Sequence, residues 1–269
     1  HPFAVGGLAY LSQIIVTLQN INNAEKEGVM SPTHPFSGLL VIDFTHVLAG
    51  PACAYYLGLL GARVIKVESI SKGDAIRHRG GTDADSAGRG MSTSYLTQGG
   101  GKESIALDLE TDAGSDAFHQ LLERADVLVE NHIPETMRQL DLEESSLAAR
   151  HPHLVHCAMT GYGRGGPQET TPAYDVNIQA ACGLMEATGT AESGPVRTGA
   201  PVLDYATALA ASFAISAALY VVHRSSFLLA ARKGASASGR SSSSACAVRS
   251  TDLKSESSGR SLSMHSTCK

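Results

Sequence analysis

Hydrophobic residues lie in short blocks along most of the chain, and the length and period of each block indicate a strand or a helix. The block at 39–44 is almost continuously apolar, which is typical of a strand buried on both faces of a parallel sheet. Comparable blocks at 63–68, 126–131 and 153–160 and an alternating block at 103–109 indicate the same kind of element. The pattern therefore predicts five strands.

Helices are predicted in the intervals between these strands. The apolar side chains of Phe118, Leu122 and Ala125 recur with the helical period after a cap at Thr111 or Asp112. The other predicted helices cover residues 52–60, 135–140, 145–150, 176–185 and a stretch that begins at 204. Strands that alternate with helices predict an α/β fold, namely a doubly wound, Rossmann-like parallel sheet with helices on both faces. In such folds the active site lies at the carboxyl ends of the strands.

Three stretches depart from this alternation. Residues 69–101 are rich in Gly, Ser and charge and are expected to form a long loop or an irregular excursion, which in a compact domain is usually functional. The apolar run 205–222 approaches the length of a membrane span, but Ala and Ser dominate it, so a buried helix is expected. Residues 225–269 are rich in Ser and Arg and are expected to be a disordered tail.

The domain boundaries follow from these contrasts. Residues 36–224 are expected to form the folded domain. Residues 1–35 are interpreted as an N-terminal extension, which need not be native because Met30 offers an internal start.

Composition narrows the choice of function. With 43% hydrophobic residues in 269, the chain can bury a sizeable core. Its net charge of -5 argues against nucleic acid, which is normally bound by a basic face. The 5 cysteines contain no Cys-x-x-Cys pair, which fits neither a disulfide framework nor a zinc site. A reducing compartment, the cytoplasm or a mitochondrial matrix, is expected, with no metal and no membrane partner.

Several segments carry a resemblance to a known family. They are Val-Ile-Asp-Phe-Thr-His-Val-Leu-Ala-Gly-Pro at 41–51 with its continuation at 60–68, Ala-Asp-Val-Leu-Val-Glu-Asn at 125–131, and the glycine-rich stretch 160–189. In this order and spacing the chain resembles the class III CoA-transferases, which include formyl-CoA transferase and the α-methylacyl-CoA racemases. The resemblance implies an acyl-CoA and a short carboxylic or dicarboxylic acid as substrates, no tightly bound cofactor, and a homodimer where the full-length family fold is present.

The resemblance assigns the catalytic nucleophile to Asp204. In the family an aspartate attacks the acyl-CoA thioester and then carries coenzyme A as an aspartyl thioester, so that one hard step becomes several easier ones. The residues alone leave another interpretation open, because Asp is also a common helix N-cap and Asp204 precedes an Ala-rich helix. At a helix N-terminus, the backbone amides would favour the anionic carboxylate.

Asp175 is a second candidate acid or base. It matches the position where the family's racemases hold a proton-shuttling acid and where formyl-CoA transferase holds a glutamate. It could equally be the N-cap of the helix that follows it.

The resemblance also implies a set of residues that bind coenzyme A. The loop around the pantetheine and thioester would contain His46, Val47 and Leu48, and two residues, Leu107 and Asn131, would lie near the nucleotide. Some basic positions of formyl-CoA transferase are replaced here, for example by Ser69 and Gln139. Nearby cations that could take over the phosphate contacts are Arg138, which we expect to bind coenzyme A, and Lys66, Lys72, Arg77 and Arg79, although each could be simply a solvated charge.

Two further functions stay open at this point. One is racemisation of a 2-methylacyl-CoA, for which Asp175 would need a histidine partner that the sequence does not identify. The other is a catalytically inactive chain, because the family's second, smaller domain is not recognisable in this sequence.

The loop at 161–166 lacks the Lys-Ser/Thr of a P-loop and is interpreted as a flexible active-site loop.

Overall fold

A computed structural model describes the backbone of residues 34–79 and 83–237 and the side chains as far as Arg224. The predicted N-terminal extension, apart from residues 34 and 35, lies outside these residues. So does the predicted tail, apart from the backbone of 225–237.

The described part contains one sheet of five parallel strands in the order β3-β2-β1-β4-β5. The predicted doubly wound sheet is confirmed, and each strand lies inside its predicted block or within one residue of it. The strands are β1 (Leu40–Phe44), β2 (Arg63–Ser69), β3 (Glu103–Leu107), β4 (Val127–Glu130) and β5 (Val155–Ala158).

The strand order reverses at β1, which pairs with both β2 and β4. The register places Phe44 opposite Glu130, so the carboxyl ends of β1 and β4 are level. Chain connections leave these two ends toward opposite faces of the sheet, which opens a crevice between them. This is the place in a doubly wound fold where ligands bind.

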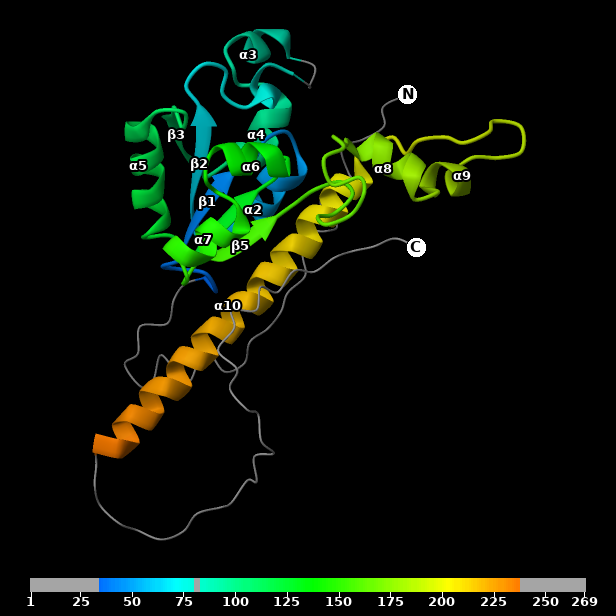
Figure 1. Ribbon diagram of the computed structural model, residues 1–269. Coiled ribbons are helices and arrows are strands. Elements are labelled where there is room, and N and C mark those ends of the chain that lie inside the picture. The colour runs from blue at the N-terminus through cyan, green and yellow to red at the C-terminus, as the bar shows by residue number, and fades with distance from the viewer. Residues whose placement is uncertain (1–33, 80–82, 238–269) are drawn as a thin grey trace, which may run out of the picture.

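Helices cover both faces of the sheet (Figure 1). Helices α2 (Ala49–Leu59) and α10 (Val202–Ala237) pack on one face against Val41 and Val127. Helices α5 (Asp112–Leu122), α6 (Pro134–Gln139) and α7 (Glu144–Arg150) pack on the other face against Ile42 and Leu128. Successive strand residues thus serve opposite cores, which explains why the strands are apolar throughout rather than alternating.

The expectation of an irregular excursion at 69–101 is wrong in part, because three short helices occur there. They are a 3-10 helix η2 (Ala75–His78), α3 (Ala84–Gly88) and α4 (Thr93–Gly99). Asp74, Asp83 and Ser92 cap them by accepting hydrogen bonds from backbone N–H groups. Helices this short have no apolar period to detect, but their caps are visible in the sequence.

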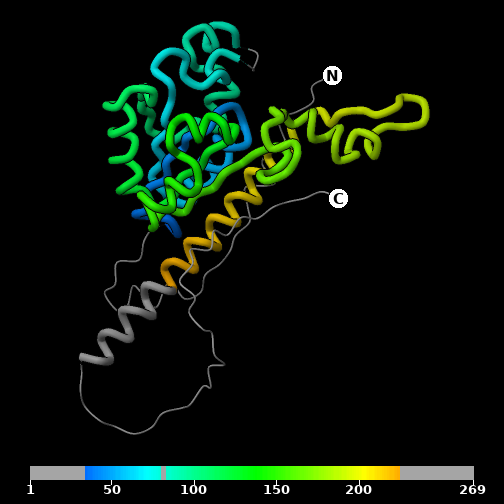
Figure 2. The backbone as a smooth tube through the Cα atoms, in the orientation of Figure 1, coloured from blue at the N-terminus to red at the C-terminus, as the bar shows by residue number. Residues whose placement is uncertain are grey.

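The single helix predicted at 176–185 is two helices, α8 (Asp175–Ala181) and α9 (Leu184–Thr188). Gly183 separates them with a φ of 81°, a left-handed conformation that glycine adopts without a steric cost. The α8–α9 segment and the chain that follows it project away from the sheet (Figure 2).

Helix α10 is not the buried helix that its composition predicts. Only a narrow stripe, which includes Ala208, Ile215 and Leu219, is buried against α2 and the sheet. Phe213 and Tyr220 are 73% and 66% exposed. By length and composition, residues 202–224 could also cross a membrane. Alanine and serine in the stripe allow close packing against α2, but composition alone does not reveal how narrow the buried stripe is.

A cluster of charged side chains is buried at the carboxyl ends of β1 and β2. Lys66 is 1% exposed, and its Nζ lies 2.9 Å from Asp74 and 3.9 Å from Asp43. The Nζ of Lys102 lies 2.7 Å from Asp43. Burial alone would raise the pKa of Asp43, but Lys66 and Lys102 lower it below its ordinary value. The carboxylate therefore stays ionised inside the domain.

This burial makes a test of the cluster possible within one strand. Lys66→Met should destabilise the domain by about 3–5 kcal/mol, because it leaves the buried Asp74 carboxylate without its cation and Asp43 with Lys102 alone. Arg63→Met is the matched control on β2, since Arg63 forms an exposed ion pair with Glu103, and it should change the stability far less. Urea unfolding of both variants measures the difference. Equal losses would contradict the assigned role of Lys66.

Candidate active site

An open hollow of about 200 Å³ lies where the first turn of α10 meets α8. Both predicted catalytic carboxylates, Asp175 and Asp204, line it. The other lining residues come from α8 and from the loop that leads into α10: Tyr174, Val176, Gln179, Arg197, Thr198, Gly199, Ala200 and Pro201. The fold thus brings together two carboxylates that are separated by almost thirty positions in the sequence.

The Asp175 carboxylate caps a helix, but not the helix that the sequence suggested. Tyr174 is the N-cap of α8, and Asp175 is its first helical residue. Its Oδ1 accepts hydrogen bonds from the backbone N–H groups of Leu203 at 2.7 Å and Asp204 at 3.2 Å. Asp175 therefore holds the start of α10 against α8, and the predicted local N-cap is wrong.

Asp204 is the third residue of α10 and not its N-cap. Since Asp175 takes the nearest amides, they do not favour the anionic form of Asp204 as the sequence suggested. Instead, burial and then the neighbouring charge of Asp175 raise the pKa of Asp204 to about 6. No described side chain donates a hydrogen bond to the Asp204 carboxylate, so its oxygens are free to react.

Sequence reasoning missed two residues of the hollow. Arg197 is exposed and forms no ion pair with any side chain that the structure describes. Gln179 is buried and bonds two neighbours. Its Nε2 donates to Asp175, and its Oε1 accepts the backbone N–H of Thr198 at 2.9 Å. Arg197 could have been predicted from the sequence only through its position, because it lies in the loop just before α10 and its candidate nucleophile.

The predicted coenzyme A loop lies in the crevice between β1 and β4. His46 follows β1, and its backbone N–H and C=O both bond the side chain of Asn131, each at 2.9 Å. Val47 has a φ of 69°, a conformation that costs a β-branched residue about 1–3 kcal/mol. Its N–H donates to Asp74 at 3.1 Å. Thus His46 of the predicted pantetheine loop and Asn131, which was predicted near the nucleotide, are in direct contact.

The His46 side chain belongs to a row of rings. Its ring centroid lies 5.2 Å from that of His132, which lies 4.2 Å from that of Phe44. Burial, and then His46, lower the pKa of His132 to about 4, so His132 is neutral at physiological pH.

The other predicted coenzyme A residues have different surroundings. Leu107 is partly buried against the core on the α5 side, and Arg138 is exposed and paired with Glu135. Two cations that seemed able to bind phosphate are engaged internally, since Lys66 is in the buried cluster and Arg77 pairs with Glu68. The exposed Lys72 and Arg79 form no ion pair with a described side chain.

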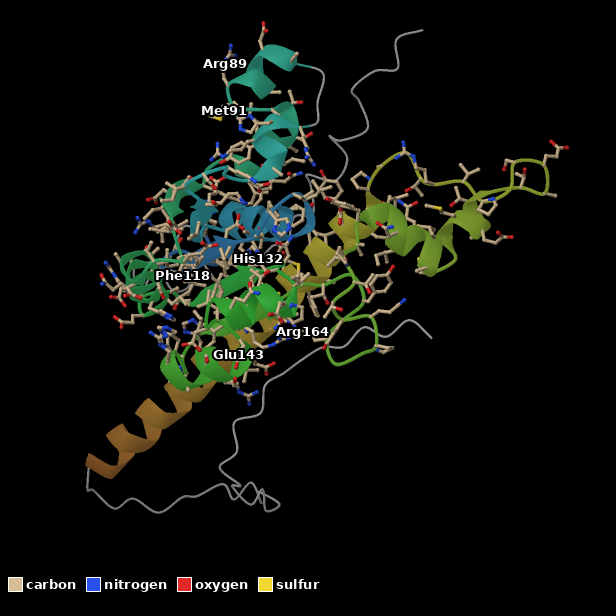
Figure 3. All side chains as sticks on the ribbon, turned by 45° about the horizontal axis from the view of Figure 1, so that its top comes forward. Arg89, Met91, Phe118, His132, Glu143 and Arg164 are labelled. Carbon is tan, nitrogen blue, oxygen red and sulfur yellow. The ribbon has the colours of Figure 1, made fainter. Side chains whose placement is uncertain are left out.

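The glycine loop at 161–166 is attached to the sheet. Arg164 donates to the fully buried carboxylate of Glu130, which also accepts the N–H of His132 at 2.9 Å. Figure 3 labels both Arg164 and His132. The ion pair restrains the middle of a loop that the sequence suggested to be flexible.

One hydrogen bond connects the two parts of the site. Gln98 of α4 donates to the hydroxyl of Tyr205, the residue after Asp204, at 3.0 Å. Gln98 also lies beside Lys66 and Asp74. The excursion therefore spans from the loop after β1 to the start of α10.

Comparison with known proteins decides the family. The profile of CoA-transferase family III matches residues 36–226. The chain belongs to this family. The resemblance predicted from the sequence is thereby confirmed.

Relatives of this CoA-transferase family III chain include acetyl-CoA:oxalate CoA-transferase of Acetobacter aceti, 39% identical over 72% of this chain and 49% of the relative. Succinyl-CoA:glutarate CoA-transferase of Mus musculus is 37% identical over 71% of this chain and 43% of the relative. A crystal structure of a CaiB/BaiF family protein from Brucella suis matches with a TM-score of 0.67 and 34% identity over 72% of this chain and 51% of that one. The chain spans about half the length of the relatives it matches.

The raised pKa of Asp204 predicts a pH dependence of stability in this family III chain. A carboxyl whose pKa is about 6 when folded and near 3.8 when unfolded destabilises the folded state as the pH rises through that window. Asp204→Asn should therefore match wild type below pH 4 and unfold at a higher temperature at pH 8. Thermal unfolding between these pH values measures the effect.

Asp175→Asn provides the control, because it retains an oxygen for the α10 amides but removes the neighbouring charge. In the Asp175→Asn variant, the destabilisation that accompanies ionisation of Asp204 should occur at a lower pH than in wild type. Equal melting temperatures of wild type and Asp204→Asn at pH 8 would contradict the raised pKa.

Proposed function

We propose that this protein transfers coenzyme A between an acyl-CoA and a small carboxylic acid, with Asp204 as the nucleophile and an aspartyl-CoA thioester as the intermediate. The observation that carries the proposal is the state of Asp204. Its carboxylate faces an open hollow, accepts no hydrogen bond from a described side chain, and has a pKa raised to about 6. It is therefore ionised at neutral pH and more basic than an ordinary aspartate.

The reaction would proceed by four acyl transfers. The Asp204 carboxylate attacks the thioester carbonyl of the donor, and the carbon–sulfur bond breaks to give a mixed anhydride and the CoA thiolate. The thiolate attacks the aspartyl carbonyl of the anhydride, which releases the donor acid and forms the aspartyl-CoA thioester. The acceptor carboxylate then attacks this thioester and expels the thiolate again. Attack of the thiolate on the acceptor acyl carbonyl gives the new acyl-CoA and restores Asp204.

Asp175 has a separate role in this scheme. Its bonds to the N–H groups of Leu203 and Asp204 fix the first turn of α10, and its charge helps to raise the pKa of Asp204. Asp175 therefore positions and tunes the nucleophile. The racemase alternative would need a histidine next to one of these carboxylates, and the described residues that line the hollow include none.

The acceptor is proposed to be a dicarboxylic acid. A carboxylate that approaches Asp204 meets two negative charges, so a cation in the same hollow is needed to attract it. Arg197 is the cation in the lining, and its guanidinium can bind a carboxylate through two parallel hydrogen bonds. The names of the relatives also pair an acyl-CoA with oxalate or glutarate. One carboxylate could then contact Arg197 while the other reacts.

Trapping of the intermediate tests the proposed nucleophile. The purified chain is incubated with succinyl-CoA and then with hydroxylamine, which converts an aspartyl thioester to a hydroxamate that mass spectrometry can locate. A hydroxamate is expected on Asp204 in wild type and in the control Asp116→Ala, which alters an exposed aspartate, and none in Asp204→Ala. The yield should fall below a pH of about 6, as Asp204 becomes protonated. A soluble, folded wild type without the adduct would refute the proposal.

Substitution of Arg197 tests the acceptor site. Arg197→Leu should raise the glutarate concentration needed for half-maximal transfer by about 10- to 100-fold, the size of a lost charge-assisted contact. Formation of the aspartyl adduct from acetyl-CoA should change little, because the acetyl group has no second carboxylate to contact Arg197. Arg197→Lys should retain part of the wild-type affinity for glutarate. Arg150→Leu, which alters an exposed ion pair with Asp141, serves as the control. A wild-type dependence on glutarate in Arg197→Leu would exclude Arg197 as the acceptor contact.

A further inference from the structure

Side chains from three separate elements hold the loop after β1. Asn131, which follows β4, bonds both the N–H and the C=O of His46. Asp74, from the excursion after β2, accepts the N–H of Val47. Lys66 of β2 donates to the C=O of Thr45 at 2.8 Å. Four consecutive hydrogen-bonding groups of this loop are thus fixed by side chains rather than by a neighbouring strand.

The backbone N–H and C=O of His46 both bond the same carboxamide, that of Asn131. Asn131 donates through Nδ2 and accepts through Oδ1, which reproduces the pairing that a parallel or antiparallel strand would offer. Because Asn131 and His46 follow β4 and β1, this pair bridges the crevice where the strand order reverses. In the sequence the two residues are 85 positions apart.

Asp74 has a different task, because Val47 adopts a left-handed conformation that valine strongly disfavours. Such a conformation persists only where surrounding contacts impose it. Asp74 is 3% exposed, caps η2 through the N–H of Ile76, and pairs with Lys66. A buried carboxylate with several partners is a rigid anchor for the Val47 N–H.

We infer that Asp74 and Asn131 are positioning residues that hold His46–Leu48 in the conformation that binds coenzyme A. The inference rests on the proposed function, and it goes further by assigning the affinity for coenzyme A to two side chains that act through the backbone of the loop. A loop that is already ordered loses little conformational entropy when a ligand binds, so its affinity is higher than that of a mobile loop. Strain at Val47 at a ligand crevice agrees with this role.

The test compares loop mobility and coenzyme A affinity in the same variants. Hydrogen exchange of the amides in residues 45–48 and calorimetric titration with free coenzyme A are measured for wild type, Asp74→Ala and Asn131→Ala. Asp85→Ala is the matched control, because Asp85 is an exposed aspartate of the same excursion. Both test variants should exchange at least tenfold faster in the loop and bind coenzyme A at least tenfold more weakly, and the control should match wild type in both.

Kinetics separate positioning from a general structural defect. The succinyl-CoA concentration for half-maximal adduct formation should rise at least tenfold, while the rate at saturation stays within about threefold of wild type. Asn131 is only partly buried, so Asn131→Ala tests the inference even if Asp74→Ala fails to fold.

Two results would overturn the inference while the proposed function stands. One is unchanged exchange of the loop amides in both variants. The other is faster exchange with wild-type affinity for coenzyme A. If wild type itself binds no coenzyme A and forms no adduct, the proposed function fails, and the inference fails with it.

Discussion

The ion pairs of Lys66 inside the domain are the interaction on which the rest of the site depends. A buried cation has lost its hydration and must be compensated by nearby carboxylates. Here these are Asp43 of β1 and Asp74 of the excursion. The same contacts fix three chain segments relative to one another at the carboxyl end of the sheet. The same cluster supports the loop after β1, with its strained Val47, because Lys66 and Asp74 bond the backbone of that loop.

The two carboxylates in the hollow show how one fold gives chemically similar side chains different roles. Asp175 is buried and accepts two backbone amides and Gln179, so its oxygens are occupied. Asp204 accepts none of these bonds, and burial beside Asp175 leaves it more basic than a solvated aspartate. The difference comes from which carboxylate the amides of α10 contact. It explains why Asp204 is the better candidate for a nucleophile.

Much of the fold could be predicted because strands buried on both faces are apolar throughout, as 40–44 and 127–130 are. The short helices of the excursion could not, because a helix of one or two turns shows no period. The extent of burial of α10 was also beyond prediction, since alanine and serine are compatible with either a buried or an exposed face. Phe213 and Tyr220 lie on the exposed part.

The sequence by itself determined the family and the sheet, and it singled out Asp204 as a candidate, because these follow from local patterns and from motifs in a fixed order. Only the tertiary structure decided the roles of the neighbours. Asp175 caps a helix that begins 27 residues after it, Asn131 bonds a peptide 85 residues before it, and Lys66 is a core cation rather than a phosphate anchor. Such roles depend on contacts between distant segments, and hydrogen-bonding partners at that distance leave no periodic trace in a sequence.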